Sequence, residues 1–262
     1  MDSRIHMGSN MLIAGPTNCG KTTFVLKLLD AMAQLFDIEP ERVYWFYGVK
    51  TDEHDLLVAR NYNVYEGLPP GYNFNFIRPN SVVVLDDLMR DAGTNPRVTE
   101  LVTGYAHDKP CFVINIVQNL FFRSPELRTQ NLNSQYKVLF PNAQAPGQIK
   151  ILANQMFPTH TRVLLDAFVD ATRRPYGYLL LDFHQRTSEL IRLRTNILPD
   201  EAPQIVYMDK RLYAETYPAR LLHGGIKKNH FASVKHKMSI NHVLRKRSLR
   251  IYKDWPIFYV KC

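Results

Sequence analysis

A short run of residues, Gly15-Pro-Thr-Asn-Cys-Gly-Lys-Thr-Thr23, has the types and spacing needed to hold the phosphates of a nucleotide. Gly15 to Thr22 match the pattern G-x-x-x-x-G-K-[ST], in which glycines permit a tight turn whose backbone N–H groups converge on phosphate oxygens. We expect Lys21 to reach the β- and γ-phosphates and the Thr22 hydroxyl to ligate Mg²⁺. ATP and Mg²⁺ are therefore the predicted ligands, and the predicted nucleotide-binding residues are Gly15, Pro16, Thr17, Asn18, Cys19, Gly20, Lys21, Thr22 and Thr23.

Two adjacent carboxylates are candidates for the other half of a hydrolytic site. Asp86 and Asp87 end the run Ser81–Asp87, whose centre is four consecutive apolar residues. Asp86 is the candidate that supports Mg²⁺, directly or through water, and Asp87 is the candidate that orients or deprotonates the attacking water. Standing alone, the pair could instead cap a following helix.

Polar residues also follow a second apolar run, Cys111–Val117. Gln118 is placed to sense the γ-phosphate or position water, although a residue of this kind can simply satisfy a turn. Arg128, with Arg123 as the second choice, could complete the site of a neighbouring copy, or could form a surface ion pair. The predicted catalytic residues are Lys21, Asp87, Gln118 and Arg128.

These residues require a sheet that brings the ends of separate strands together. Runs that are apolar throughout are typical of parallel strands buried between helix layers, and such sheets bind ligands at the carboxyl ends of their strands. We therefore predict an α/β fold with a mostly parallel sheet and helices on both faces. The predicted strands are Met11–Ala14, Arg42–Gly48, Ser81–Asp87, Cys111–Val117 and Tyr136–Phe140, with a hairpin-like pair at Tyr178–Phe183 and Glu189–Arg194 that closes the sheet. The predicted helices are Thr23–Phe36, Asp52–Arg60, Asn95–Ala106, Gln148–Phe157 and Thr161–Ala171.

Composition limits the class of protein. The chain has 262 residues, of which 45% are hydrophobic, enough for one large domain with an appendage. It has no run of eighteen uncharged apolar residues, and the phosphate loop occupies the place where a signal peptide would lie. Three scattered cysteines suit neither a disulfide framework nor a zinc site. We expect a protein without a membrane span that is not secreted and resides in a virion or host cell.

Positive charge is concentrated at one end of the sequence. The net charge is +9, and residues 204–262 hold 13 Lys and Arg against 3 Asp and Glu, whereas residues 1–203 are nearly neutral. The predicted domains are therefore a core over 1–203 and a basic C-terminal extension over 204–262. Basic clusters with interleaved aromatic residues favour binding to DNA or RNA. Two alternatives remain: a nuclear-import signal, and a solvated basic extension that has no dedicated partner. The basic clusters are Lys227-Lys228, Lys235-His-Lys237 and Arg245-Lys-Arg247.

Taken together, the motifs over about residues 8–200 resemble one family. The phosphate loop, Val82-Val-Val-Leu-Asp-Asp87, Ile116-Val-Gln-Asn-Leu-Phe121, Arg128-Thr-Gln-Asn-Leu-Asn-Ser-Gln-Tyr136 and Gln148-Ile-x-x-Leu-Ala-x-Gln-Met156 are similar to those of genome-packaging ATPases of double-stranded DNA viruses and Polinton-like elements. These enzymes are grouped with the FtsK/HerA translocases, and the poxvirus packaging ATPase is a better-known relative.

The resemblance implies a RecA-like (ASCE) P-loop core in which the strand carrying Gln118 lies between the phosphate-loop strand and the acidic strand. It implies a homo-oligomeric ring, usually a hexamer, that drives double-stranded DNA into a capsid, with capsid or portal proteins as partners. It also implies that Asp86 supports Mg²⁺, Gln118 is the sensor and Arg128 is the trans-acting arginine. The family commonly has Glu where this sequence has Asp87, and the shorter carboxylate favours slow hydrolysis.

Other functions remain alternatives. A viral superfamily 3-type helicase has a similar phosphate loop and an asparagine sensor, for which Asn119 is a candidate, but the 65-residue interval from Lys21 to Asp86 is long for that class. A basic structural protein of the virion that retains a nucleotide fold is a second alternative. A small-molecule kinase is disfavoured because no arginine-rich lid is evident between the later strands.

Overall fold

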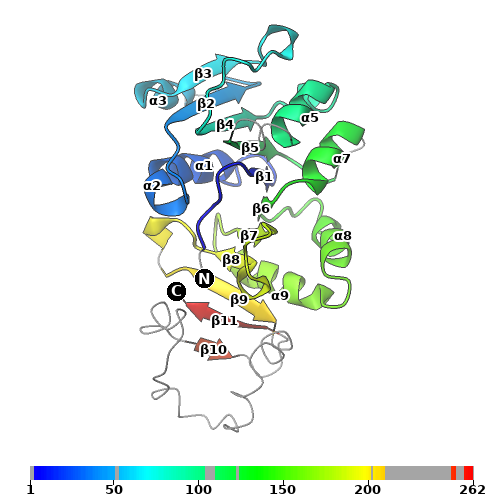
Figure 1. Cartoon of the computed structure of the whole chain (residues 1–262). Coiled ribbons are helices and arrows are strands. Elements are labelled where there is room, and N and C mark those ends of the chain that lie inside the picture. Colours follow the sequence, from blue (N-terminus) through cyan, green and yellow to red (C-terminus); the bar gives the residue numbers. More distant parts are fainter. Residues whose placement is uncertain are drawn as a thin grey trace.

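The computed structural model describes residues 3–50, 53–103, 110–121, 124–201, 203–209, 249–251 and 257–261. Within these residues one sheet runs the length of the molecule in the order β10-β11-β9-β8-β7-β6-β1-β5-β4-β2-β3. Figure 1 shows it as a twisted ladder from the cyan end to the red end. The strands are β1 (Asn10–Ala14), β2 (Arg42–Tyr47), β3 (Asn63–Glu66), β4 (Ser81–Asp86), β5 (Cys111–Val117), β6 (Tyr136–Leu139), β7 (Leu179–Asp182), β8 (Leu193–Thr195), β9 (Ile205–Asp209), β10 (Leu249–Ile251) and β11 (Ile257–Lys261).

The sheet has a parallel part and an antiparallel part. Strands β3, β2, β4, β5, β1 and β6 pair in parallel, and every pairing from β6 through β7, β8, β9, β11 and β10 is antiparallel. The four central parallel strands are almost wholly buried, as expected for strands covered on both faces. The aromatic run in β2 is core: Tyr44, Trp45 and Phe46 are at most 5% exposed.

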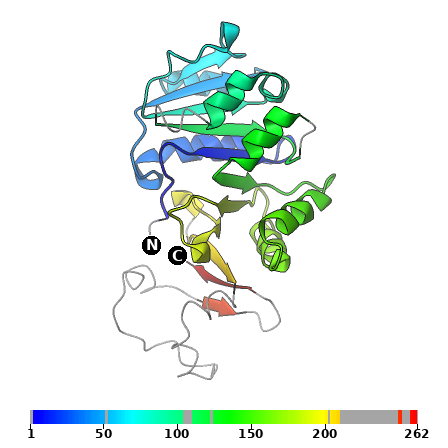
Figure 2. The same cartoon turned by 45° about the vertical axis from the view of Figure 1, so that its right-hand side comes forward.

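Helices cover both faces of the sheet. One face packs against α1 (Lys21–Asp30), α2 (Met32–Leu35) and α3 (Glu53–Ala59). The other packs against α4 (Met89–Ala92), α5 (Pro96–Thr103), α7 (Pro125–Leu132), α8 (Gly147–Met156) and α9 (Thr161–Ala171). In Figure 2, α5 and α7 (green) cross the near face while α1 (blue) lies behind the sheet. The predicted α/β fold with helices on both faces of the sheet is therefore confirmed.

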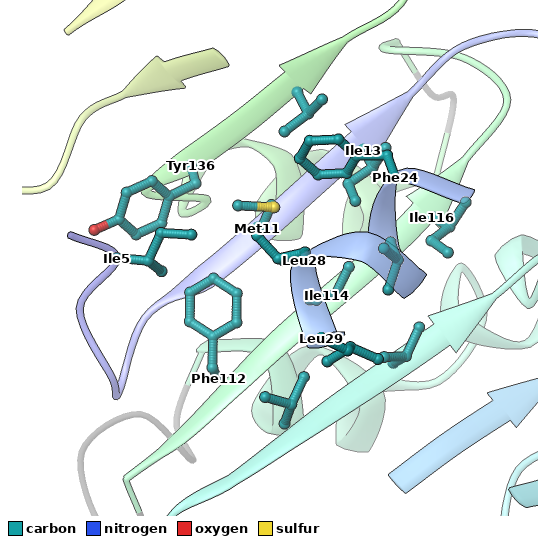
Figure 3. Close-up of a cluster of buried hydrophobic side chains, with 14 of the residues drawn as sticks. Ile5, Met11, Ile13, Phe24, Leu28, Leu29, Phe112, Ile114, Ile116 and Tyr136 are labelled. Atoms are coloured by element: carbon teal, nitrogen blue, oxygen red, sulfur yellow. The ribbon is translucent and has the colours of Figure 1, made fainter. Parts of the chain in front are cut away.

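Helix α1 is held to the sheet by apolar contacts directly behind the phosphate loop. Its buried residues Phe24, Leu28 and Leu29 face the strands, as Figure 3 shows. The strand residues that meet them in this cluster include Met11 and Ile13 of β1, Ile114 and Ile116 of β5, and Tyr136 of β6.

Two predicted elements differ from those observed. The helix predicted over Thr23–Phe36 is broken at Ala31, which leaves helical geometry and separates α1 from α2. The strand predicted over Glu189–Arg194 begins only at Leu193, because the Ser188 side chain accepts a hydrogen bond from the Leu190 N–H and caps a 3-10 turn.

The sheet continues past the hairpin pair that was predicted to close it. Strand β9 begins two residues beyond position 203, the predicted end of the core, and pairs with β8, while β11 pairs with β9. The three predicted basic clusters of the C-terminal extension lie outside the described residues, as do Asp52, Arg123 and residues 104–106. Among the described helices, none is both long and apolar enough to span a bilayer.

The N-terminal segment is fastened where the parallel and antiparallel parts meet. The guanidinium of Arg194 on β8 donates to the Ser3 carbonyl and pairs with Asp182 on β7, and both side chains of this ion pair are buried. The same N-terminal segment also contacts the chain after α2, where His6 Nδ1 lies 2.8 Å from Asp37 Oδ2. If the buried ion pair of Arg194 and Asp182 were broken, water could not solvate the separated charges. The pair therefore fixes the mutual position of β7, β8 and the segment before β1.

A second buried cation lies on β6. Lys137 is 2% exposed, and its ammonium donates to the carbonyls of Asn131 and Ser134, at the C-terminal end of α7. A cation at a helix C-terminus complements the helix dipole. Burial nevertheless lowers the pKa of Lys137 to about 7.

We predict that Lys137→Met removes a pH dependence of stability. Unfolded Lys137 stays protonated up to about pH 10.4, whereas the folded side chain loses its proton near pH 7, so the unfolded state binds more protons between these values. The free energy of unfolding should therefore rise between pH 7 and 10 by up to about 1.4 kcal/mol per pH unit from this group. Denaturant titrations of wild type and variant across that range measure the difference; parallel curves would contradict the prediction.

Candidate functional site

The phosphate loop leaves the carboxyl end of β1 and enters α1. Gly20 precedes the helix with φ 98°, a left-handed conformation that glycine adopts without strain, and Asn18 has φ 60°. Gly15 has no room for a side chain, because a Cβ there would lie 2.6 Å from Cys19 Sγ and 2.7 Å from Phe140 Cβ. The local sequence therefore forces the tight turn that points the N-terminus of α1 at the loop.

The Lys21 side chain bends back onto the backbone of the phosphate loop. Its ammonium donates to the carbonyls of Gly15 and Pro16 at 2.8 and 2.7 Å. Thr22, half-buried, lies in the first turn of α1, while Thr17 and Thr23 are exposed. The positive charge of Lys21 therefore lies at the phosphate loop, beside the N-terminus of α1, and both features favour the binding of an anion.

Cys19 occupies the inner side of the same turn. Burial raises the pKa of its thiol, even though the nearby Lys21 charge acts in the opposite direction. The thiol is therefore protonated at neutral pH, which suits a packing role against Gly15 rather than a nucleophile.

Strand order brings the predicted acidic and amide residues to this loop. Strand β5 lies between β1 and β4, as the family resemblance implied. The Gly15 N–H donates to the Val117 carbonyl at 3.2 Å, so the loop begins beside the residue that precedes Gln118. Asp86, at the end of β4, is in register with Ile116 of β5.

Asp87 and Gln118 are in direct contact. The Gln118 side-chain amide donates to Asp87 Oδ1 at 3.2 Å, and both residues are exposed at the strand ends. Asp87 has φ 53°, a strained conformation for a non-glycine residue, which turns the chain sharply after β4. Gly48 permits this turn, because a Cβ there would lie 2.6 Å from the Asp87 carbonyl oxygen.

Oxygen ligands for a metal are present but few. Thr22 offers a hydroxyl and Asp86 a carboxylate, the type of donor that Mg²⁺ takes when phosphates and water supply the remaining ligands. The described residues contain no cluster of three or more His, Cys, Asp or Glu side chains that would hold an ion by protein ligands alone. The donor set therefore fits Mg²⁺ bound together with a nucleotide.

Arg128 lies on helix α7 and at the end of no strand. Its side chain is exposed, and it forms no hydrogen bond or ion pair with any other described residue. The structure thus gathers the phosphate loop, Asp86, Asp87 and Gln118 within one chain and leaves Arg128 on an outer surface.

A buried polar network that the sequence analysis missed connects α7 to both sides of this site. The Gln130 side chain accepts from Asn115 of β5 at 3.0 Å and donates to the Ala92 carbonyl of α4 at 3.0 Å and to Thr99 of α5 at 3.1 Å. The Asn131 amide donates to the Leu120 carbonyl, two residues after Gln118. Helix α7 therefore holds the segments that follow β4 and β5.

Comparisons with known proteins find 41 matching chains among solved structures, two of them described below, and no match to a family model or a curated protein. The genome packaging NTPase B204 from Sulfolobus turreted icosahedral virus 2, in complex with sulfate, is 12% identical with a TM-score of 0.44, over 71% of this chain and 95% of its own. The DNA-packaging ATPase B204 from Sulfolobus turreted icosahedral virus is 10% identical with a TM-score of 0.47, over 70% and 96% respectively.

We predict that Gln130→Leu, a change of similar volume, destabilises the protein strongly. It leaves two buried groups, the Asn115 side-chain amide and the Ala92 carbonyl, without the partner that Gln130 gives them, each at a cost of about 1–3 kcal/mol. Chemical denaturation should therefore show a lower free energy of unfolding by at least about 2 kcal/mol. Thr129→Ala is the matched control, because the exposed Thr129 hydroxyl donates to the Pro125 carbonyl of its own helix and to no other described residue. Equal stability of the two variants would contradict the network.

Proposed function

We propose that this chain is an ATP-hydrolysing DNA translocase that packages a viral double-stranded DNA genome. The observation that carries the hydrolytic part is the strand order β1-β5-β4, which sets the phosphate loop, Gln118 and the acidic pair at one edge of the sheet. That arrangement has the parts that phosphoryl transfer to water requires: a phosphate cradle, a metal-supporting carboxylate and polar groups that orient water.

Each residue has a role in this proposal. The loop from Gly15 to Thr23 binds the nucleotide phosphates, and Lys21 exchanges its two carbonyl partners for phosphate oxygens. Thr22 and Asp86 support Mg²⁺, which neutralises charge on the phosphates when bound. Asp87 orients the attacking water.

Gln118 steadies the carboxylate of Asp87 and senses the γ-phosphate. Its amide donates to Asp87 Oδ1, so movement of the Gln118 side chain toward a phosphate would release or reorient the carboxylate. Aspartate is one methylene shorter than glutamate and lies on a strained turn. Hydrolysis is therefore expected to be slow until DNA or a neighbouring copy brings the water into line.

The contact between Asp87 and Gln118 also bears on the helicase alternative. Asn119 is the residue that a helicase-type sensor would use, but its side-chain oxygen accepts from Gln148 of α8 at 3.4 Å. Since Gln118 and not Asn119 touches the acidic residue, the pattern favours the translocase.

The packaging role is supported by the motifs of the sequence and by its basic end. The family resemblance spans about residues 8–200, and residues 204–262 carry the excess positive charge that a polyanion attracts. Double-stranded DNA, a capsid or portal vertex protein, and further copies of this chain in a ring are the proposed partners. The proposed location is the virion or the host cell, in its nucleus or a viral factory.

Arg128 is proposed to complete the site of the adjoining copy. An arginine that stabilises transition-state charge must approach the γ-phosphate, and within one chain Arg128 is exposed on α7 and pairs with no described carboxylate. Arg123 is the second candidate.

We predict that Lys21→Ala abolishes measurable ATP hydrolysis and weakens ATP binding about 10- to 150-fold, the equivalent of about 1.5–3 kcal/mol for one charge-assisted contact. Calorimetry with ATP and hydrolysis assays with and without blunt duplex DNA provide the measurements. The matched control is Lys27→Ala on the same helix, whose ammonium instead pairs with Asp200 at 2.7 Å. Unchanged ATP affinity in Lys21→Ala would remove the nucleotide-binding assignment.

We predict that subunits carrying Arg128→Ala inhibit the wild-type subunits with which they assemble. Adding Arg128→Ala subunits to wild-type protein should reduce DNA-stimulated hydrolysis more than in proportion to their fraction, because each altered copy disables its neighbour's site. Thr129→Ala subunits, altered at the adjacent exposed position, serve as the control. A strictly proportional loss with Arg128→Ala would assign it to a role within its own chain.

A further inference from the structure

We propose that Tyr176 is the surface on which the base of the bound nucleotide stacks. This inference rests on the proposed function, because it takes the phosphate loop as the place where the triphosphate binds. It adds a base-binding subsite that the sequence motifs did not indicate.

Tyr176 lies directly against the phosphate loop although it follows α9, more than 150 residues later in the sequence. A Cβ built on Gly20 would lie 3.2 Å from Tyr176 Cδ1 and 3.6 Å from its Cβ, so the ring borders the last loop residue before α1. The side chain is nevertheless 70% exposed. An aromatic ring that contacts a binding loop and presents most of its surface to solvent is available to a planar ligand.

The turn that carries Tyr176 is tight and strained. The Gly177 N–H donates to the Arg174 carbonyl at 3.0 Å. A Cβ on Gly177 would lie 2.4 Å from the Ala171 carbonyl oxygen, so the backbone of the turn packs closely against the end of α9. Tyr176 itself has φ 58°, a left-handed conformation that is costly for a bulky side chain. The fold therefore holds the ring beside Gly20 at an energetic cost that packing into the core does not explain.

Strand order gives the direction in which the nucleotide must lie. Gln118 and Asp87, the proposed partners of the γ-phosphate, follow β5 and β4 on one side of β1. Tyr176 precedes β7, which lies with β6 on the other side of β1. A triphosphate whose γ end points toward β5 and β4 extends its ribose and base past Thr22 and Thr23 toward β6 and β7, where Tyr176 lies.

The two arginines of the same turn are engaged elsewhere. The Arg174 guanidinium donates to the Asn196 side chain, and Arg173 pairs with Asp170 at 3.7 Å. Tyr176 is thus the planar group of this turn that faces the loop. Stacking on an aromatic ring accepts any base, so the subsite adds affinity for nucleotides in general rather than selecting adenine.

The test compares ATP with inorganic tripolyphosphate, which has the phosphates but no base. The variants are Tyr176→Asn, which adopts positive φ more readily than tyrosine, and Tyr176→Phe, which keeps the ring. For full-length Tyr176→Asn we expect ATP and GTP, each with Mg²⁺, to bind about 5- to 100-fold more weakly in calorimetry, while tripolyphosphate binds as it does to wild type. Tyr176→Phe should bind ATP within about twofold of wild type because the ring persists.

Thermal unfolding of Tyr176→Asn separates binding from folding, since its stability should equal or exceed that of wild type. Equal losses for ATP and tripolyphosphate would mean that Tyr176 only shapes the loop, and unchanged ATP affinity would mean that the base lies elsewhere; either result overturns the inference. Unchanged ATP affinity together with lost self-association in sedimentation would assign the ring to a contact between copies and also overturn it. Failure of the proposed function is distinct: wild type would then bind neither ligand, or Lys21→Ala would bind both normally.

Discussion

The pairing of β5 between β1 and β4 is the constraint on which the candidate site depends. Through the hydrogen bond from the Gly15 N–H to the Val117 carbonyl, the start of the phosphate loop is joined to the strand that ends in Gln118. The ladder between β5 and β4 then sets Asp86 beside the same edge. These bonds are buried among apolar side chains, so they are costly to break, and the sheet therefore fixes where the strand ends that carry the candidate residues lie.

Helix α7 extends that constraint to the surface. Its inward side chains, Gln130 and Asn131, bond to the segments that follow β4 and β5, and its outward side carries Arg128. A satisfied network of buried hydrogen bonds makes the groups that it joins more rigid and fixes their mutual position. The segments that follow β4 and β5 are thereby joined through α7 to the surface that carries Arg128.

Local pattern was sufficient to predict part of this arrangement. The phosphate loop, the apolar strands and their polar ends are each encoded within a few neighbouring residues, and the burial of β4 and β5 followed from their unbroken apolar runs. The contact of Tyr176 with Gly20 and the bonds of Gln130 join residues far apart in sequence, so no periodicity could indicate them. The break at Ala31 depends on one residue leaving helical geometry within a pattern whose apolar spacing continues.

The buried pair of Asp182 and Arg194 has a consequence for how sequences related to this one can diverge. Removing one partner leaves an uncompensated charge in the interior at a cost of about 3–5 kcal/mol, whereas an apolar pair of similar volume is tolerated. Substitution at one position alone would thus be selected against, and the two positions should covary across an alignment. The same guanidinium also donates to the backbone carbonyl of Ser3. Because every residue has a backbone carbonyl, this contact does not restrict the identity of residue 3.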